Sequence, residues 1–313
     1  MAGGILLSWE GYWRRRGWGP SLEADRDAWM LTRARVRPTS TVLLGTSRIA
    51  AAIDPDIWAR TLGTEPPVML AVEGEGALPA LADMANDTSF RGHLVVEMLA
   101  IETFSRDAGK SGPLHDYLRA YHESRSSPAR QWEAWLRVHV PSHMVFRRIE
   151  LLPNRLIPRL RGGRGVRPVH YHLREDQFRP IDFRIDNMPP NRPLIMDSAH
   201  FAYMRGWGVP VTGARLDSVV ARIGGEIARI QQRGGRVTLI TFQGCGGRRL
   251  MELGLYPKET YWNRLRALPG VQAIDSDDHP DIAGLPCYDG SHIDAAYAPA
   301  VTAQVARLVE QTR

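Results

Sequence analysis

Short apolar runs alternate with helix-like segments along this chain, and this alternation limits the possible folds more than any other feature. The runs are rich in Val, Ile and Leu without polar alternation, which is typical of strands buried on both faces of a parallel sheet. They lie at 41–44, 68–72, 94–96, 237–242 and 271–274. Between and after them, helices are predicted at 54–62, 77–88, 216–232, 258–267 and 294–309. The sequence therefore predicts an α/β fold in three layers, with helices on both faces of a mostly parallel sheet.

The alternation stops between residues 105 and 213, which we interpret as a helical, Arg-rich insertion or lid in a domain spanning 41–313. Helix-like pieces at 113–123 and 128–139 are followed by a stretch from 147 to 174 that holds eight arginines and one acidic residue. This stretch is either a solvated basic excursion or a surface for a polyanion, an acidic polysaccharide or membrane headgroups.

The charge balance gives only weak information about partners. The chain has 40 basic and 34 acidic residues, a net charge of +6, and its N-terminal extension, residues 1–40, is rich in Trp and Arg. The arginine excess reflects either a GC-rich genome or an anionic partner. The basic stretch lacks the pattern of a nucleic-acid-binding module, so we expect no nucleic-acid partner. No apolar run reaches the ~18–20 residues of a membrane span.

The motif Gly45-Thr46-Ser47-Arg48 directly follows the first predicted strand, at the edge where open α/β sheets place their sites. Gly45 permits a tight turn out of the strand, and Ser47 then projects above the sheet. If a helix begins there, its free N–H groups lie where they would stabilise an oxyanion. Alone, the motif also fits an ordinary strand-to-helix turn in which serine caps the helix.

A second motif, Asp289-Gly290-Ser291-His292, precedes the last predicted helix. A histidine three residues after an aspartate can meet it across a single turn. Asp289 would then fix the imidazole tautomer and leave the other nitrogen of His292 free as a base. Alone, this motif also fits a capped helix start. Taken together in an α/β chain, the two motifs predict Ser47, Asp289 and His292 as the catalytic residues.

This pair of motifs resembles the first and last blocks of the SGNH (GDSL-like) hydrolase superfamily. Thr46 stands where that family usually has Asp, and GTSR with LPCYDGSHID is most similar to a divergent, polysaccharide-associated branch that includes alginate O-acetyltransferase-like and D-alanylation-related proteins. The resemblance covers residues 41–104 and 214–312. It implies a flavodoxin-like SGNH fold and a serine esterase or O-acyltransferase. Such an enzyme would act on acylated carbohydrate or cell-envelope polysaccharide through an acyl-enzyme at Ser47.

The resemblance also implies an oxyanion hole. In the family, a second-block glycine adds its N–H to that of the nucleophile, and here Gly74 is the best candidate, followed by Gly76. A third-block Asn normally completes the hole, but the corresponding strand end has Glu97, and a carboxylate cannot donate unless it is protonated. Gln243, after the fourth strand, could supply a donor or contact the substrate.

Several other residues keep two interpretations. Arg48 either pairs with a structural carboxylate or faces an anionic group of the substrate. Cys245 and Cys287 are either a free structural pair or a disulfide of an exported protein. His170 and His172 alternate like a ligand pair, but no carboxylate or cysteine stands at metal-ligand spacing in a defined element, so we expect no metal and no cofactor.

A second hypothesis is a non-catalytic accessory protein on the same fold, serving a membrane-bound acyltransferase or a polysaccharide export system. The missing Asn, the Thr at position 46 and the Trp/Arg-rich N-terminus favour it. A separation of Ser47 from His292 beyond roughly 5 Å would also support it. The resemblance implies a periplasmic or membrane-tethered protein with peripheral membrane association. The sequence itself shows no export signal, so a cytoplasmic location stays open.

Overall fold

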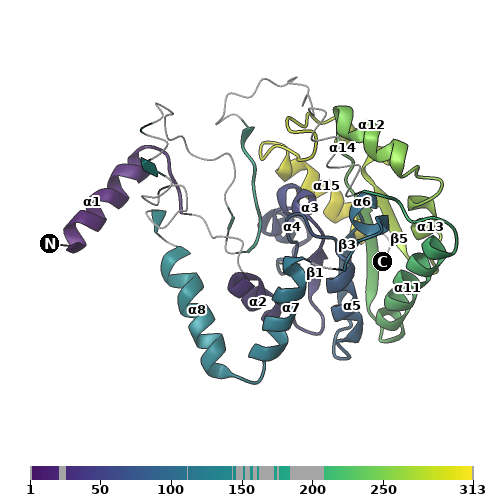
Figure 1. Ribbon diagram of the computed structural model, residues 1–313, viewed down its shortest axis with the longest axis horizontal. Coiled ribbons are helices and arrows are strands. Elements are labelled where there is room, and N and C mark those ends of the chain that lie inside the picture. Colours follow the sequence, from purple (N-terminus) through teal and green to yellow (C-terminus); the bar gives the residue numbers. More distant parts are fainter. Residues whose placement is uncertain are drawn as a thin grey trace.

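The strands of the chain form one all-parallel sheet (Figure 1). The computed structural model describes residues 2–20, 26–110, 112–142, 144–145, 151, 156–157, 161, 173–174, 176–183 and 208–311. The strands are β1 (Thr41–Leu44), β2 (Val68–Met69), β3 (His93–Glu97), β4 (Arg236–Thr241) and β5 (Gln272–Asp275). Their order is β2-β1-β3-β4-β5, the order of flavodoxin-like doubly wound sheets. The predicted three-layer α/β/α class is confirmed.

The two faces of the sheet bury two separate cores, because successive strand residues point to opposite sides. One core takes Val42, Leu44, Leu94, Val96, Val237 and Leu239. It is covered by α2 (Arg26–Ala34), α5 (Leu78–Asn86), α7 (Pro113–Ser124), α11 (Gly213–Gln232) and α13 (Trp262–Arg266). The other core takes Leu43, Val95 and Ile240 and is covered by α3 (Ser47–Ala52), α4 (Pro55–Leu62) and α15 (Ala298–Glu310).

Most predicted elements lie within a few residues of the observed ones. Asp54 caps α4 as expected, since its Oδ1 accepts from the N–H groups of Asp56 and Ile57. The second strand is shorter than predicted, yet its bonding to β1 continues beyond Met69, because the Val72 N–H donates to the Gly45 carbonyl. The last helix begins at Ala298, four residues later than predicted.

The predicted insertion and the N-terminal extension pack against each other and the sheet domain. Helix α2 contacts both α7 and α8 (Pro128–Ser142), while α1 (Ala2–Arg15) projects from the body in Figure 1. The other helices in the described part of the chain are α6 (Ala100–Phe104), α12 (Gly246–Leu255), α14 (Pro280–Ala283) and the 3-10 turn Ser276–Asp278. Among the described residues, no helix combines the length and apolar character of a bilayer crossing. Most of the basic stretch from 147 to 174, with His170 and His172, lies outside those residues.

Candidate active site at the carboxyl edge of the sheet

The turn out of β1 requires glycine at position 45. Gly45 has a φ of +155°, and a Cβ there would lie 2.6 Å from Glu97 Cβ and 2.7 Å from Ile49 Cγ2. Because the backbone passes this close to β3 and α3, any side chain would force them apart. The turn therefore fixes where α3 begins and where Ser47, its first residue, is placed.

Thr46, and not Ser47, caps α3. Its Oγ1 accepts from the Arg48 N–H at 3.2 Å. The Thr46 N–H and hydroxyl both donate to Glu97 Oε2, at 2.8 and 2.9 Å. Burial raises the pKa of Glu97, although these bonds and the charge of Arg48 oppose the rise. The alternative in which serine caps the helix is thus wrong, and the Ser47 hydroxyl is free for another contact.

The structure brings Ser47, Asp289 and His292 together, although 245 residues separate the first from the last. His292 Nε2 lies 2.7 Å from Ser47 Oγ, and His292 Nδ1 lies 2.5 Å from Asp289 Oδ2. The other oxygen of Asp289 accepts the N–H groups of Ser291 and His292, at 2.9 and 2.8 Å. Asp289 is therefore held to the same short loop as the imidazole that it orients.

The electrostatics of this loop favour an ionised aspartate. Burial by itself raises the pKa of Asp289, but the hydrogen bonds and charge of His292 and the N–H of Ser291 outweigh it, so the pKa is lowered. An ionised Asp289 accepts from His292 Nδ1–H, which leaves Nε2 to accept the hydroxyl proton of Ser47. The arrangement can thus generate a nucleophilic alkoxide and stabilise the imidazolium that forms.

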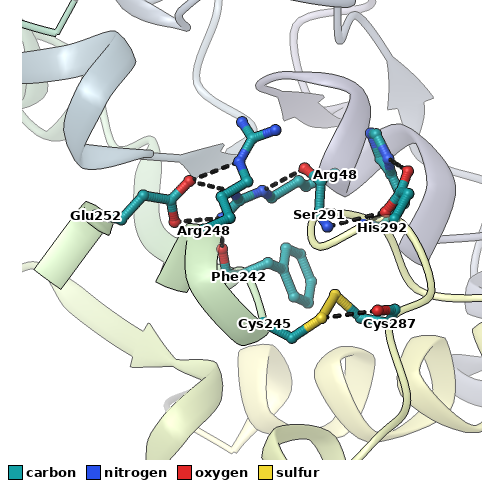
Figure 2. The surroundings of a disulfide bond; sticks show 9 residues. Arg48, Phe242, Cys245, Arg248, Glu252, Cys287, Ser291 and His292 are labelled. Atoms are coloured by element: carbon teal, nitrogen blue, oxygen red, sulfur yellow. Dashed lines mark hydrogen bonds and ion pairs between the residues drawn. A yellow bond between two sulfur atoms is a disulfide. The ribbon is translucent and has the colours of Figure 1, made fainter. Parts of the chain in front are cut away.

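A disulfide joins the loop of His292 to the start of α12. Cys245 and Cys287 are bonded across a sequence separation of 42 residues. Of the two alternatives, a free pair or a disulfide, the structure therefore has the disulfide. The Cys245 N–H also donates to the Gly290 carbonyl at 3.0 Å. Figure 2 shows the disulfide and the loop of Ser291 and His292 next to each other. The covalent link and the backbone bond together tie the histidine loop to the end of β4.

Arg48 is a structural residue, so the expectation of a substrate contact is corrected in favour of the structural carboxylate. Its side chain is 2% exposed and lies between Glu252 and Ser291 in Figure 2. Nη2 is 2.5 Å from Glu252 Oε1, while Nη1 donates to the Phe242 carbonyl at 2.7 Å. Nε donates to Ser291 Oγ at 3.1 Å. The guanidinium is thus committed to fixing α12, the end of β4 and the histidine loop to α3.

Beside Ser47 lies a small cavity of about 20 Å³. The sheet domain contributes small or apolar walls (Ala50, Ala71, Val72) and Glu73. The remaining walls come from the extension and the insertion, and they are Trp29, Tyr117, Leu173, Gln177 and Arg179. Arg179 is buried and forms an ion pair with Glu73. The insertion therefore contributes directly to the surroundings of the predicted nucleophile.

Only some of the residues expected in the oxyanion hole lie beside the cavity. The N–H groups of Ser47 and Gly74 have no hydrogen-bond partner in the part of the chain that the structure describes, and Gly74 adjoins the cavity-lining Glu73. Gly76 packs closely on α6, where a Cβ would lie 2.6 Å from the Glu102 carbonyl oxygen. Gln243 is directed elsewhere, since its Nε2 lies 3.5 Å from Asp275 Oδ1 and it lines other cavities.

Three carboxylates at the start of α4 and in the insertion are close enough to share a metal ion, namely Asp54, Asp56 and Asp176. The guanidinium of Arg174 already lies among them, with Nη1 3.0 Å from Asp54 Oδ2 and Nη2 2.6 Å from Asp176 Oδ2. This cluster therefore works as an ion-pair network that fastens the insertion to α4.

Sequence reasoning missed Glu252, the partner of Arg48, and Gln177, which faces the cavity. Glu252 lies in α12, a helix that the sequence analysis did not predict. Its apolar residues among glycines and arginines were the only available signal. Gln177 lies in a segment without periodicity, so no sequence signal could place it.

Comparison with known proteins adds no family assignment. No protein-family model matches the chain, and no curated protein matches it significantly. The function must therefore be argued from the geometry of the site itself.

Proposed function

We propose that this protein is a serine esterase or O-acyltransferase of the SGNH type that forms an acyl-enzyme at Ser47. The observation that carries the proposal is the continuous chain of contacts from Ser47 Oγ through the His292 imidazole to Asp289, at 2.7 and 2.5 Å. Such a chain, at the carboxyl edge of a parallel sheet and beside a cavity, is the arrangement that acyl transfer requires.

The proposed reaction has two steps. His292 Nε2 takes the hydroxyl proton while Ser47 Oγ bonds to the ester carbonyl carbon, and the carbonyl electron pair moves to the oxygen. The N–H of Ser47 is available to this oxyanion. The intermediate then collapses, the alcohol leaves with the proton held by His292, and an acyl-serine remains. Water or a sugar hydroxyl then gives its proton to His292 and bonds to the acyl carbonyl carbon. The bond between the acyl carbon and Ser47 Oγ breaks, and Oγ takes the proton back from His292.

The size of the cavity favours a short acyl group. About 20 Å³ is close to the space that one water molecule needs, which matches a methyl group better than a longer chain. The similarity of the two motifs to the polysaccharide-associated branch favours an acylated carbohydrate as the donor or acceptor. We therefore propose an acetyl-sized ester of a carbohydrate as the substrate class.

The alternative, a non-catalytic accessory protein, is less well supported. It would be favoured by a Ser47–His292 separation beyond roughly 5 Å, whereas Oγ and Nε2 lie 2.7 Å apart. Thr46 in place of Asp does not argue for inactivity either, because Thr46 has a structural task as the cap of α3 and the partner of Glu97.

The proposal is tested by labelling the purified protein with a fluorophosphonate and locating the adduct by mass spectrometry. We expect the adduct on Ser47 and hydrolysis of p-nitrophenyl acetate faster than that of p-nitrophenyl butyrate. Ser47→Ala should lose both labelling and turnover, by about 10⁴-fold or more in kcat. The matched control is Ser218→Ala, because Ser218 is exposed on α11 and bonds only within its own helix. Labelling that persists in Ser47→Ala would remove Ser47 from the mechanism.

A further inference from the structure

We propose that Gln177 donates its side-chain amide to the carbonyl oxygen of the ester bound at Ser47 and to the oxyanion formed from it. This inference rests on the proposed function, because it assigns a residue to the same acyl-transfer site. Gln177 belongs to the insertion and lies 130 positions after the proposed nucleophile Ser47. It would supply the side-chain amide that the missing Asn supplies in the family. It makes Gln177 a catalytic residue, since the amide would touch the reacting carbonyl.

The first observation is a buried amide without a partner. Gln177 is 5% exposed and lines the cavity that Ser47 also lines. Its Nε2 is buried and has no hydrogen-bond partner among the residues that the structure describes. A buried N–H group without an acceptor destabilises the folded protein, so native proteins seldom leave one unless a ligand or a bound water supplies the acceptor. A carbonyl oxygen in the cavity is such an acceptor.

The second observation is the backbone of the same residue. Gln177 has a φ of +66°, and it is the one non-glycine residue with a positive φ in the part of the chain that the structure describes. Glutamine gains nothing from this conformation, which glycine or asparagine adopts more easily, and such outliers cluster at functional sites. The turn is closed by the Arg174 N–H donating to the Phe178 carbonyl at 2.9 Å. The Arg179 N–H then donates to the Ala50 carbonyl of α3 at 2.8 Å.

The third observation is that, among the described residues, the other side-chain N–H groups considered for this donor role already have acceptors. The Trp29 indole N–H in the cavity wall donates to the Leu70 carbonyl at 3.1 Å. Arg179 is paired with Glu73. Outside the cavity, Gln243 is directed toward Asp275. Glu97 is no N–H donor, and its Oε2 accepts the Thr46 donors. Among the described residues, Gln177 is therefore the side-chain amide that is uncommitted and lines the same cavity as Ser47.

The test compares Gln177→Gly with the wild-type protein in p-nitrophenyl acetate hydrolysis, with Ser47→Ala defining the background. Glycine removes the amide and suits a φ of +66°, so the melting temperature should stay the same or rise. Loss of one oxyanion donor should lower kcat about 10²- to 10³-fold, while KM changes less than about threefold, because the donor acts mainly in the transition state. A residue with only a structural role would not give this split between kcat and KM.

The outcomes separate this inference from the proposed function. If Gln177→Gly keeps its kcat within about threefold while the turnover still depends on Ser47, the role of Gln177 is refuted and the proposed function stands. If the wild-type protein shows no turnover that depends on Ser47, both are overturned. If Gln177→Gly does not fold, Gln177→Asn replaces it, since asparagine tolerates a positive φ and holds its amide one methylene further back. Its kcat should then fall at least about tenfold, and an unchanged kcat refutes the inference.

Discussion

Replacing Gly45 by alanine should damage both the stability and the activity of the protein. The new Cβ would lie 2.6 Å from Glu97 Cβ, about 0.8 Å closer than the 3.4 Å at which ordinary contacts begin. Forcing an extra carbon into a packed site costs about 1–3 kcal/mol, and a positive φ adds about 1–2 kcal/mol for a residue with a side chain. We therefore expect Gly45→Ala to lose about 2–5 kcal/mol of unfolding free energy.

The matched control is Gly63→Ala. Gly63 ends α4 with a φ of +65°, and an added Cβ there meets no atom within 4 Å. Its φ is also positive, but an added Cβ has no steric clash, so Gly63→Ala should lose only about 1–2 kcal/mol. Because Gly63 precedes β2 and Ser47 follows β1, the control lies at the opposite edge of the parallel sheet from the site.

Urea unfolding followed by tryptophan fluorescence measures the two losses, and p-nitrophenyl acetate hydrolysis measures the displacement of Ser47. A shift of nearly 1 Å between nucleophile and base costs about 10²-fold in rate, so Gly45→Ala should be about 10²-fold slower and Gly63→Ala should be unchanged. Equal stability losses in the two variants, or full turnover in Gly45→Ala, would refute the argument that contact with Glu97 sets the position of Ser47.

Two further predictions concern the pH dependence of stability. The pKa of Asp289 is lowered in the folded protein, so its contribution is present above the unfolded value of about 3.9 and is lost as pH falls through the lower folded value. The stability difference between the wild type and Asp289→Asn should therefore shrink below pH 4 in urea titrations, and a constant difference down to pH 2 would contradict this. The pKa of Glu97 is raised, so the wild type should lose stability relative to Glu97→Gln as pH rises from about 4.3 to the folded value. If the stability of the two proteins changed in parallel with pH, burial would not raise the pKa of Glu97.

The sheet and the residues Ser47, Asp289 and His292 could be predicted because each depends on local patterns. The first strand and the cap at Asp54 follow from apolar runs and from the preference for proline at a helix start, and the structure has both at the expected positions. The meeting of Ser47 with His292 follows from topology, since the carboxyl ends of parallel strands share one edge.

The partners of buried polar groups could not be predicted in this way. Arg48 pairs with Glu252 across 204 residues, and Gln177 reaches the cavity through an insertion without regular periodicity. Such contacts depend on the course of the loops around the sheet. A single sequence has no periodic pattern that predicts this course. The same is true of Thr46, whose role as helix cap and partner of Glu97 depends on a close approach between β1 and β3.

The disulfide has a consequence for how this protein is prepared and handled. Cys287 lies two residues before Asp289, so the covalent bond limits the freedom of the segment that carries the imidazole. Cells that keep thiols reduced would yield molecules in which only noncovalent contacts hold that segment. The specific activity of recombinant material should therefore vary with the redox chemistry of the host and purification buffers, even when the polypeptide is pure and folded.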